Sequence, residues 1–181
     1  MNKPKEIILH CAATPEGKEY NAKDIDKMHK NRGFKKIGYH YVIKLDGTVE
    51  KGRDEKENGA HCLNHNTKSI GINYIGGLAK DAKTPKDTRT PAQKESMYKL
   101  VDDVMTRYNI PLSKVHGHYE FANKKCPCFK IETFRNEFSE WKKNQSNSTK
   151  NILLTNVSKS GWLEKLFNFI KEIINFFNKT K

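Results

Sequence analysis

The sequence predicts an α/β protein with a mixed central β-sheet flanked by helices and with a C-terminal amphipathic helical tail. Strand-like and helical segments alternate along residues 1–141, which is typical of a sheet packed against helices. Within this alternation, Asp46-Gly47 separates two β-rich runs and predicts a hairpin, so one pair of strands is antiparallel. After Trp141 the composition becomes rich in Asn, Ser and Lys, which marks the end of the domain.

The first element is a buried strand. The apolar run Ile7–Leu9 predicts it, and the strand leads into a turn of small residues before Thr14. Side chains alternate along a strand, so His10 and Cys11 face opposite ways and only one of them can line a site on a given face. His10 is the better metal ligand, and we expect Cys11 to be a small buried apolar residue.

One helix and three further strands are expected in the middle of the chain. Residues 21–30 predict a helix, and residues 37–44, 48–51 and 69–77 predict strands. A polar loop at residues 59–66 precedes the last of these strands. The residues near one face of the helix are Ile25, Met28 and His29.

A longer helix is expected to begin after Thr90. Thr90 as N-cap, Pro91 as first helical residue and Gln93 three residues after the cap all agree on this start. The helix is expected to run to about Tyr108 and to bury Met97, Leu100, Val101, Val104 and Met105. A last helix, from about Ile131 to Trp141, is expected to close the domain.

The segment His116–Phe129 contains two imidazoles, two thiols and two ammonium groups within little more than a dozen residues. Such groups are costly to bury without partners, whereas imidazole and thiolate are preferred ligands of zinc. One His and one Cys leave a metal site incomplete, and His10 is the candidate for the missing ligand. The alternative is a surface loop that carries His and Cys incidentally.

The net charge of +13 indicates an anionic partner, such as nucleic acid, a phospholipid surface or a wall polymer. Residues 142–181 hold eight basic and two acidic side chains, so the tail is the more basic part per residue. No Lys/Arg block interleaved with aromatic residues and no helix-turn-helix pattern is present, so we expect no nucleic-acid partner. The alternative is that the lysines only solvate the surface.

The four cysteines do not resemble a disulfide framework at this length, so we expect reduced thiols and synthesis in a reducing compartment. The N-terminus leads into only three strong apolar residues, too few for the core of a signal peptide. No stretch approaches the roughly 20 apolar residues that a membrane-spanning helix needs.

The tail is predicted to consist of a linker at residues 142–160 and an amphipathic basic helix at residues 161–181. Apolar residues recur there at helical spacing: Trp162, Leu163, Leu166, Phe167, Ile170, Ile173, Ile174 and Phe177. An aromatic helix with basic residues beside it is typical of an interfacial membrane binder, so an anionic membrane surface is a candidate partner. The alternatives are that this helix docks on the domain or pairs with a second copy.

Four sequence blocks occur in order: Ile8–Thr14, Gly38–Glu55, His65–Ile72 and His118–Pro127. Together they resemble the zinc-dependent N-acetylmuramoyl-L-alanine amidases of the phage lysozyme and peptidoglycan-recognition-protein type, over roughly residues 6 to 141. The resemblance is strongest to the short phage lysozymes that lyse bacteria from within, the endolysins. It implies a catalytic domain at residues 1–141, a Zn²⁺ cofactor and cleavage of the amide between N-acetylmuramic acid and L-alanine in bacterial peptidoglycan.

Carried over residue by residue, the resemblance implies that His10, His118 and Cys126 are the zinc ligands. It implies catalytic roles for Tyr39 and Lys124, which without it would be a packed aromatic residue and a solvated charge. Cys128 stands where a small Ser or Gly is usual in the family, and it offers a competing thiolate.

Three further residues are left with open roles. His61 and Asn73 are candidates for binding substrate in the glycan-peptide groove. Glu120 is open between orienting a ligand histidine and being a plain surface charge.

For an enzyme of this kind, we expect synthesis in the cytoplasm of the bacterial host and action on the cell wall after release. The alternatives are a non-catalytic peptidoglycan-binding module, an inhibitor of a phage RNA polymerase, and a bacteriocin-like toxin delivered by its tail. The set of two His and one Cys argues against the first alternative, because non-catalytic members of the family characteristically lose the Cys.

Overall fold

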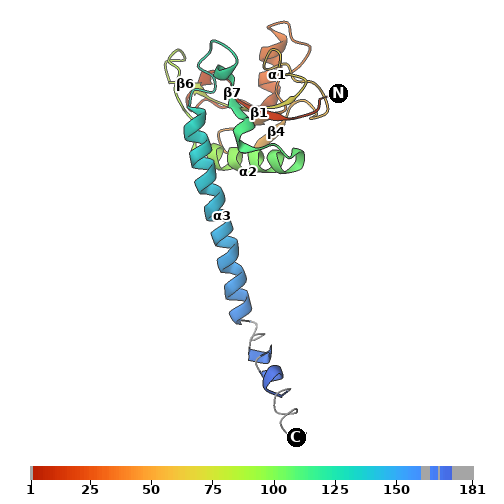
Figure 1. The fold of residues 1–181 in the computed structure, drawn as a ribbon. Helices are drawn as coiled ribbons and strands as arrows, with labels where there is room; N and C mark the ends of the chain where they lie inside the picture. Colours follow the sequence, from red (N-terminus) through yellow and green to blue (C-terminus); the bar gives the residue numbers. More distant parts are fainter. Residues whose placement is uncertain (1, 160–163, 167, 173–181) are drawn as a thin grey trace. The chain divides into compact units, whose positions relative to one another are not determined.

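The structure is a computed structural model that describes residues 2–159, 164–166 and 168–172 (Figure 1). It divides into two compact units, Met1–Glu137 and Phe138–Lys181. The long helix α3 (Ile131–Lys159) contributes residues to both units.

The first unit is built on a mixed five-stranded sheet with the strand order β4-β3-β5-β1-β7. β3 and β4 form the antiparallel hairpin, and the other neighbouring strands are parallel. This arrangement confirms the predicted mixed sheet. The five strands are β1 (Glu6–Cys11), β3 (Tyr41–Ile43), β4 (Val49–Lys51), β5 (Ser69–Tyr74) and β7 (Val115–Gly117). A second, two-stranded parallel sheet pairs β2 (Thr14–Pro15) with β6 (Gly77–Leu78).

Helices α1 (Ala22–Lys30) and α2 (Pro91–Tyr108) lie on opposite faces of the sheet (Figure 1). On the α1 face, Ile25 packs in a buried cluster with Val42 and Ile75. Two short 3-10 helices, η1 (Leu112–Lys114) and η2 (His118–Glu120), flank β7.

β1 is the central strand of the hydrophobic core. Its residues Ile7, Ile8, Leu9 and His10 have no exposed surface. β5 and β7 pair with both edges of the strand, and helices cover both faces of the sheet to which its side chains point (Figure 1). An imidazole in this position has lost its contact with water, so it needs polar partners. The strand therefore delivers His10 into the interior, at the end of a rigid element.

The N-terminus of α2 has the predicted capping box. The Thr90 hydroxyl accepts from the Gln93 backbone N–H, and the Gln93 side chain accepts from the Thr90 backbone N–H. The predicted buried face needs a correction, because Leu100 and Met105 are only partly buried. Gln93 and Tyr98 are buried on this helix in addition to Met97, Val101 and Val104.

α3 runs to Lys159, whereas the sequence predicted a helix that ends near Trp141. Residues 142–159, which were expected to form a linker, are therefore helical in the structure. Of the predicted amphipathic helix at residues 161–181, residues 164–166 and 168–172 are helical, and the rest lies outside the described residues. The described apolar side chains Leu166, Phe169 and Ile170 are exposed.

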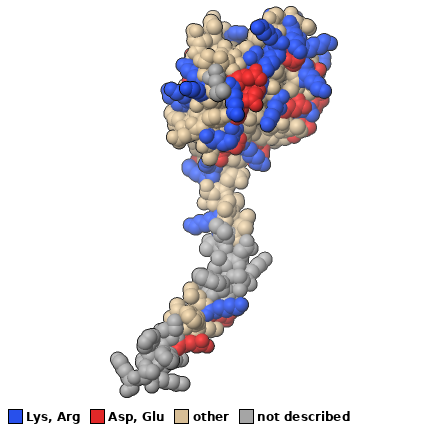
Figure 2. Space-filling model, turned by 90° about the vertical axis from the view of Figure 1, so that its right-hand side faces the viewer, with Lys and Arg blue, Asp and Glu red and all other residues tan. Residues whose placement is uncertain are grey.

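Among the helices that the structure describes, none combines the length and the apolar character needed to cross a bilayer. Basic side chains are numerous on the face of the first unit seen in Figure 2, and acidic side chains lie between them. The positive charge of this face is therefore distributed and is not gathered into one uniform patch.

Candidate metal centre

Three potential metal ligands from separate parts of the first unit converge on one point. His10 comes from the end of β1, His118 from the start of η2, and Cys126 from the loop that follows. One ligand atom of each lies within 4.8 Å of the others. The His10 Nδ1 and the Cys126 Sγ are 3.7 Å apart, and the two imidazole centroids are 4.5 Å apart.

These distances fit a tetrahedral zinc ion. Zn–N and Zn–S bonds of about 2.0 and about 2.3 Å at a tetrahedral angle would separate the two ligand atoms by about 3.6 Å. The observed 3.7 Å between His10 Nδ1 and Cys126 Sγ agrees with this value. Two imidazoles and one thiol are also the donor types that zinc prefers. The distance between His10 and Cys126 and the donor types of all three residues therefore fit the expected cofactor.

Both imidazoles are held in the neutral form that metal binding requires. Burial lowers the pKa of His10 well below its ordinary value, and the neighbouring His61, His118 and Lys124 lower this pKa further. Burial also lowers the pKa of His118, with a further contribution from the Lys124 ammonium. An unprotonated ring nitrogen is thus available to a metal without prior loss of a proton.

The Cys126 sulfur receives a backbone hydrogen bond. The N–H of Cys11 donates to the Cys126 Sγ at 3.2 Å. The Cys126 carbonyl accepts from the Tyr119 N–H at 2.8 Å, and the next carbonyl, that of Pro127, accepts from the Tyr74 hydroxyl at 2.8 Å. These bonds tie the loop to the sheet and hold the thiol beside His10.

Cys128 has different surroundings from Cys126. Its Sγ lies 3.6 Å from the Sγ of Cys11, and it does not belong to the group of three convergent ligands. The contact with the Cys11 thiol, and then burial, raise the pKa of the Cys128 thiol. Cys128, the second cysteine that the sequence offers as a ligand, therefore contacts the Cys11 thiol and not the two histidines.

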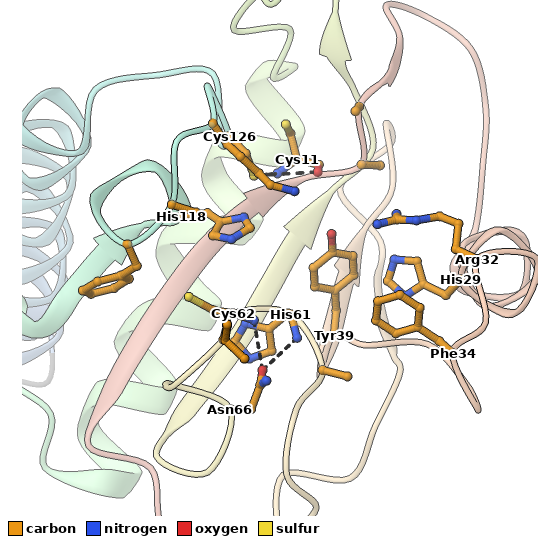
Figure 3. Close-up of a pocket in the computed structure, with 17 residues that line it drawn as sticks. Cys11, His29, Arg32, Phe34, Tyr39, His61, Cys62, Asn66, His118 and Cys126 are labelled. Carbon is orange, nitrogen blue, oxygen red and sulfur yellow. Dashed lines mark hydrogen bonds between the residues drawn. The ribbon is translucent and has the colours of Figure 1, made fainter.

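A pocket of about 480 Å³ opens beside the three ligands, and Figure 3 shows its lining residues. His118 and Cys126 lie on one side of it, and His29, Arg32 and Phe34 lie on the other.

The predicted catalytic residues Tyr39 and Lys124 both line this pocket. The Tyr39 ring centroid is 5.0 Å from that of His10. In Figure 3, Tyr39 lies on the same side of the pocket as His29 and Phe34, away from His118. Burial raises the pKa of Tyr39, and the Cys126 and Cys11 sulfurs raise it further, so the phenol keeps its proton. Lys124 is exposed at the rim, two residues before Cys126.

The two predicted substrate-binding residues lie in different places. Asn73 has no exposed surface and does not line the pocket, so it is not positioned to contact a substrate there. It pairs with His10 in the register of β1 and β5, and this central position in the sheet buries its side chain. His61 does line the pocket, but the Nδ1 of its ring is 3.0 Å from the Nε2 of His10.

Glu120, whose role the sequence left open, forms hydrogen bonds away from the three ligands. Its carboxylate lies 2.9 Å from the Nδ1 of His116 and accepts from the N–H of Gly117 at 3.0 Å. Glu120 therefore stabilises the turn that leads from β7 into η2. The structure also places Arg32, Phe34 and His29 in the pocket, which sequence reasoning missed.

Two imidazoles and a thiol that converge beside an open pocket, on a mixed α/β sheet, form a possible metal centre of the kind found in metal-dependent hydrolases. Enzymes of this class use three protein ligands and leave the fourth position for water or substrate. Comparisons with known proteins identify the family within this class.

The family model of N-acetylmuramoyl-L-alanine amidase matches residues 1–129. The endolysin of Escherichia phage T7 is 35% identical over 139 residues, which cover 77% of this chain and 86% of that protein. Among solved structures, the N-acetylmuramoyl-L-alanine amidase LysC from Clostridium intestinale superimposes with a TM-score of 0.65 at 28% identity, covering 76% of this chain and 87% of that one. Drosophila PGRP-LB superimposes with a TM-score of 0.59 at 25% identity, covering 70% of this chain and 76% of that one.

The chain belongs to the N-acetylmuramoyl-L-alanine amidase family, of the type that phage endolysins and peptidoglycan recognition proteins share. It is a peptidoglycan amidase, which confirms the fold, the family and the enzyme class that the sequence predicted.

Proposed function

We propose that the protein uses a zinc ion held by His10, His118 and Cys126 to hydrolyse the amide between N-acetylmuramic acid and L-alanine, and that Tyr39 and Lys124 act on the substrate. The observation that supports this proposal most strongly is the convergence of the three ligand atoms within 4.8 Å beside an open pocket. When bound, zinc would polarise the substrate carbonyl and lower the pKa of a coordinated water molecule to about 7.

Tyr39 is assigned the role of a hydrogen-bond donor to the substrate. An amide carbonyl that is attacked by water develops negative charge on its oxygen, and a donor fixed in advance stabilises this charge. The phenol of Tyr39 has a raised pKa and therefore remains a donor at neutral pH. Its packing between the His10 and His29 rings, with centroids 5.0 and 5.1 Å away, limits its movement.

Lys124 is assigned the role of a positive charge beside the reacting carbonyl. It lines the pocket, and its charge reaches the imidazoles of both His10 and His118, whose pKa values it lowers. The same field would stabilise an oxyanion formed nearby. The departing amine of L-alanine needs a proton, and both Lys124 and Tyr39 carry one at the pocket.

The products of digestion test this proposal. Purified sacculi are digested with the protein, and the fragments are analysed by mass spectrometry. We expect intact glycan strands and free stem peptides with L-alanine at their N-terminus, and we expect digestion to stop after exhaustive chelation and to resume when Zn²⁺ is added. Shortened glycan strands, cleavage within the stem peptide, or full activity after chelation would contradict the proposal.

We further propose that the protein acts on the wall after its release from the host cytoplasm, and that residues 161–181 bind an anionic membrane surface. The supporting observations are the basic, aromatic sequence of this segment and the exposure of Leu166, Phe169 and Ile170 in its described part. Apolar side chains on a basic helix bind at the lipid interface, with a strength that depends on anionic lipid.

Co-sedimentation with lipid vesicles tests the membrane proposal. The full chain and a truncation after Trp141 are compared on vesicles of phosphatidylglycerol and of phosphatidylcholine. We expect only the full chain to sediment, and only with the anionic lipid. Equal partitioning of the two proteins would remove the proposal.

A further inference from the structure

The His61 ring occupies a narrow slot in the first unit. A Cβ atom added at Gly59 would lie 2.4 Å from the His61 Cδ2, and one added at Gly71 would lie 2.5 Å from the same atom. Neither glycine has a positive φ, so the backbone conformation alone does not call for glycine at these two positions. Their lack of side chains is therefore explained by the space that the His61 ring takes.

The loop that carries His61 is also fixed. The side-chain oxygen of Asn66 accepts from the backbone N–H groups of His61 and Cys62, at 2.8 and 2.9 Å. The exposed fraction of His61 is 9%, so little of this residue is open to the pocket. A ring with so little freedom is suited to hold another group in place.

A sequence of hydrogen bonds determines which nitrogen of His61 carries the proton. The Ser69 hydroxyl donates to the His65 carbonyl at 2.7 Å, so its oxygen is left to accept from the His61 Nε2, 3.4 Å away. A neutral imidazole has one N–H donor and one acceptor nitrogen. If the Nε2 of His61 is the donor, its Nδ1 is the acceptor.

The protonation of His61 in turn fixes which nitrogen of His10 carries a proton. Its Nε2 is 3.0 Å from the His61 Nδ1, so it must carry the proton that this bond needs. The His10 Nδ1 is then left with a lone pair, and this is the atom that lies 3.7 Å from the Cys126 Sγ. A chain of hydrogen bonds thus runs from the His65 carbonyl through Ser69 and His61 to the His10 Nε2. It leaves the lone pair of His10 on Nδ1, the nitrogen that faces Cys126.

We infer that His61 is a positioning residue that holds His10 in the tautomer protonated on Nε2 and thereby presents the Nδ1 of His10 to the metal. This inference rests on the proposed zinc site, and it gives His61 a role in place of the substrate contact that the sequence suggested. A histidine ligand usually donates its second N–H to a carboxylate, a carbonyl or water. Here the acceptor is another imidazole.

Zinc affinity of variants provides the first test, measured for the full chain by competition with a chelating dye. Loss of such a supporting hydrogen bond commonly weakens metal binding by about 10-fold to 100-fold, so we expect this loss for His61→Leu. His61→Asn is the matched variant, because its side-chain oxygen can accept from the His10 Nε2 in place of the ring Nδ1. We expect His61→Asn to bind zinc within a few fold of the unaltered protein, and equal affinity of His61→Leu would overturn the inference.

Nuclear magnetic resonance provides the second test and needs no variant. Long-range ¹H–¹⁵N spectra of the unaltered chain, recorded in the absence of zinc, report the protonation of each ring nitrogen. We expect the Nε2 of His10 and the Nε2 of His61 to carry the protons. A protonated His10 Nδ1 would overturn the inference even if His61→Leu fails to fold.

Cys126→Ala distinguishes a failure of the zinc site from a failure of the role of His61. If the unaltered chain binds one zinc ion and Cys126→Ala does not, the proposed site stands, and the His61 variants then test only the positioning role. If the unaltered chain binds no zinc, the proposed metal site fails, and the spectra still decide the tautomer of His10.

Discussion

Cys126 and Cys128 are separated by a single proline, yet their sulfurs have different neighbours. The Cys126 Sγ lies 3.7 Å from the His10 Nδ1, whereas the Cys128 Sγ lies 3.6 Å from the Cys11 Sγ. The backbone N–H group of Cys11 also donates to the Cys126 Sγ, at 3.2 Å. These contacts support Cys126 as the ligand, although two thiols so close in sequence are hard to distinguish by motif alone.

Replacement of each thiol tests this assignment. We expect Cys126→Ala to lose zinc binding and activity, because it removes one of the three ligands. Cys128→Ala should keep most of both and is the matched control. Zinc content by atomic emission and the release of dye from labelled sacculi measure the two properties, and the reverse pattern would show that the assigned ligand is displaced by two residues.

Removal of a single hydroxyl tests the role of Tyr39. We expect Tyr39→Phe to lower kcat by roughly 10²-fold to 10³-fold, the usual effect of losing a donor to an oxyanion, with little change in KM. Zinc binding should be retained, since the phenol is not one of the three ligands. Tyr20→Phe, outside the pocket, is the control, and an unaltered kcat in Tyr39→Phe would refute the assignment.

Individual site residues were predictable from the sequence only to the extent that motifs carried them. His10, His118 and Cys126 were found because the spacing of family blocks points to them, and the structure brings their ligand atoms together. The contact between His10 and His61 spans 51 residues, and its direction depends on the Ser69 hydroxyl. No pattern of spacing in one sequence contains that information.

At the level of elements, α2 was the most accurately predicted. Its start is encoded locally, since Thr90, Pro91 and Gln93 each favour the same boundary. The structure adds a second role for Gln93, whose side-chain N–H₂ donates to the carbonyls of Ile43 and Ile75 at 3.1 and 2.9 Å. One residue thus caps the helix and joins it to two segments of the sheet layer.

Loss of the Gln93 side-chain hydrogen bonds should destabilise the first unit. Gln93→Ala would remove the side-chain donor to the Ile75 carbonyl, one of the two donors to the Ile43 carbonyl, and half of the capping box. We therefore expect a loss of on the order of 2–4 kcal/mol in the free energy of unfolding. Urea denaturation followed by circular dichroism measures it. Lys99→Gln, on an exposed position of the same helix, should change stability by less than about 0.5 kcal/mol, and equal effects of both variants would refute the role of Gln93.

No strand was predicted at β7, and α3 was predicted to end too early; both differences have physical reasons. β7 has only three residues, and it is a strand because it pairs with β1, more than a hundred residues earlier in the chain. α3 continues through residues rich in Asn, Ser and Thr, which have modest helix propensity. There the hydroxyls of Ser146 and Thr149 donate to the carbonyls four residues earlier, so polar side chains bond within the helix.

Across the whole molecule, histidines are buried to an unusual degree. His10, His29, His40 and His61 all have an exposed fraction below 10%. For each of them burial is the main cause of a pKa below the ordinary value of 6.5. The folded protein therefore keeps these rings neutral at a pH at which the unfolded chain protonates them.

Stability should therefore fall as the pH drops below about 6.5. Where the unfolded state binds more protons than the folded state, the free energy of unfolding rises with pH, by at most about 1.4 kcal/mol per pH unit for each such histidine. We expect little change between pH 8 and pH 7 and a progressive loss between pH 6.5 and pH 5.5. Urea denaturation of the zinc-free protein at these pH values measures this, and equal stability at pH 7.5 and pH 5.5 would contradict the expectation.

The His10 and Cys126 side chains that meet in the site are 116 residues apart in the chain. A ribosome therefore makes most of the first unit before the second of these groups exists. A copy whose synthesis stops before Cys126 has only two of the three convergent side chains, so the proposed centre can form only late in translation.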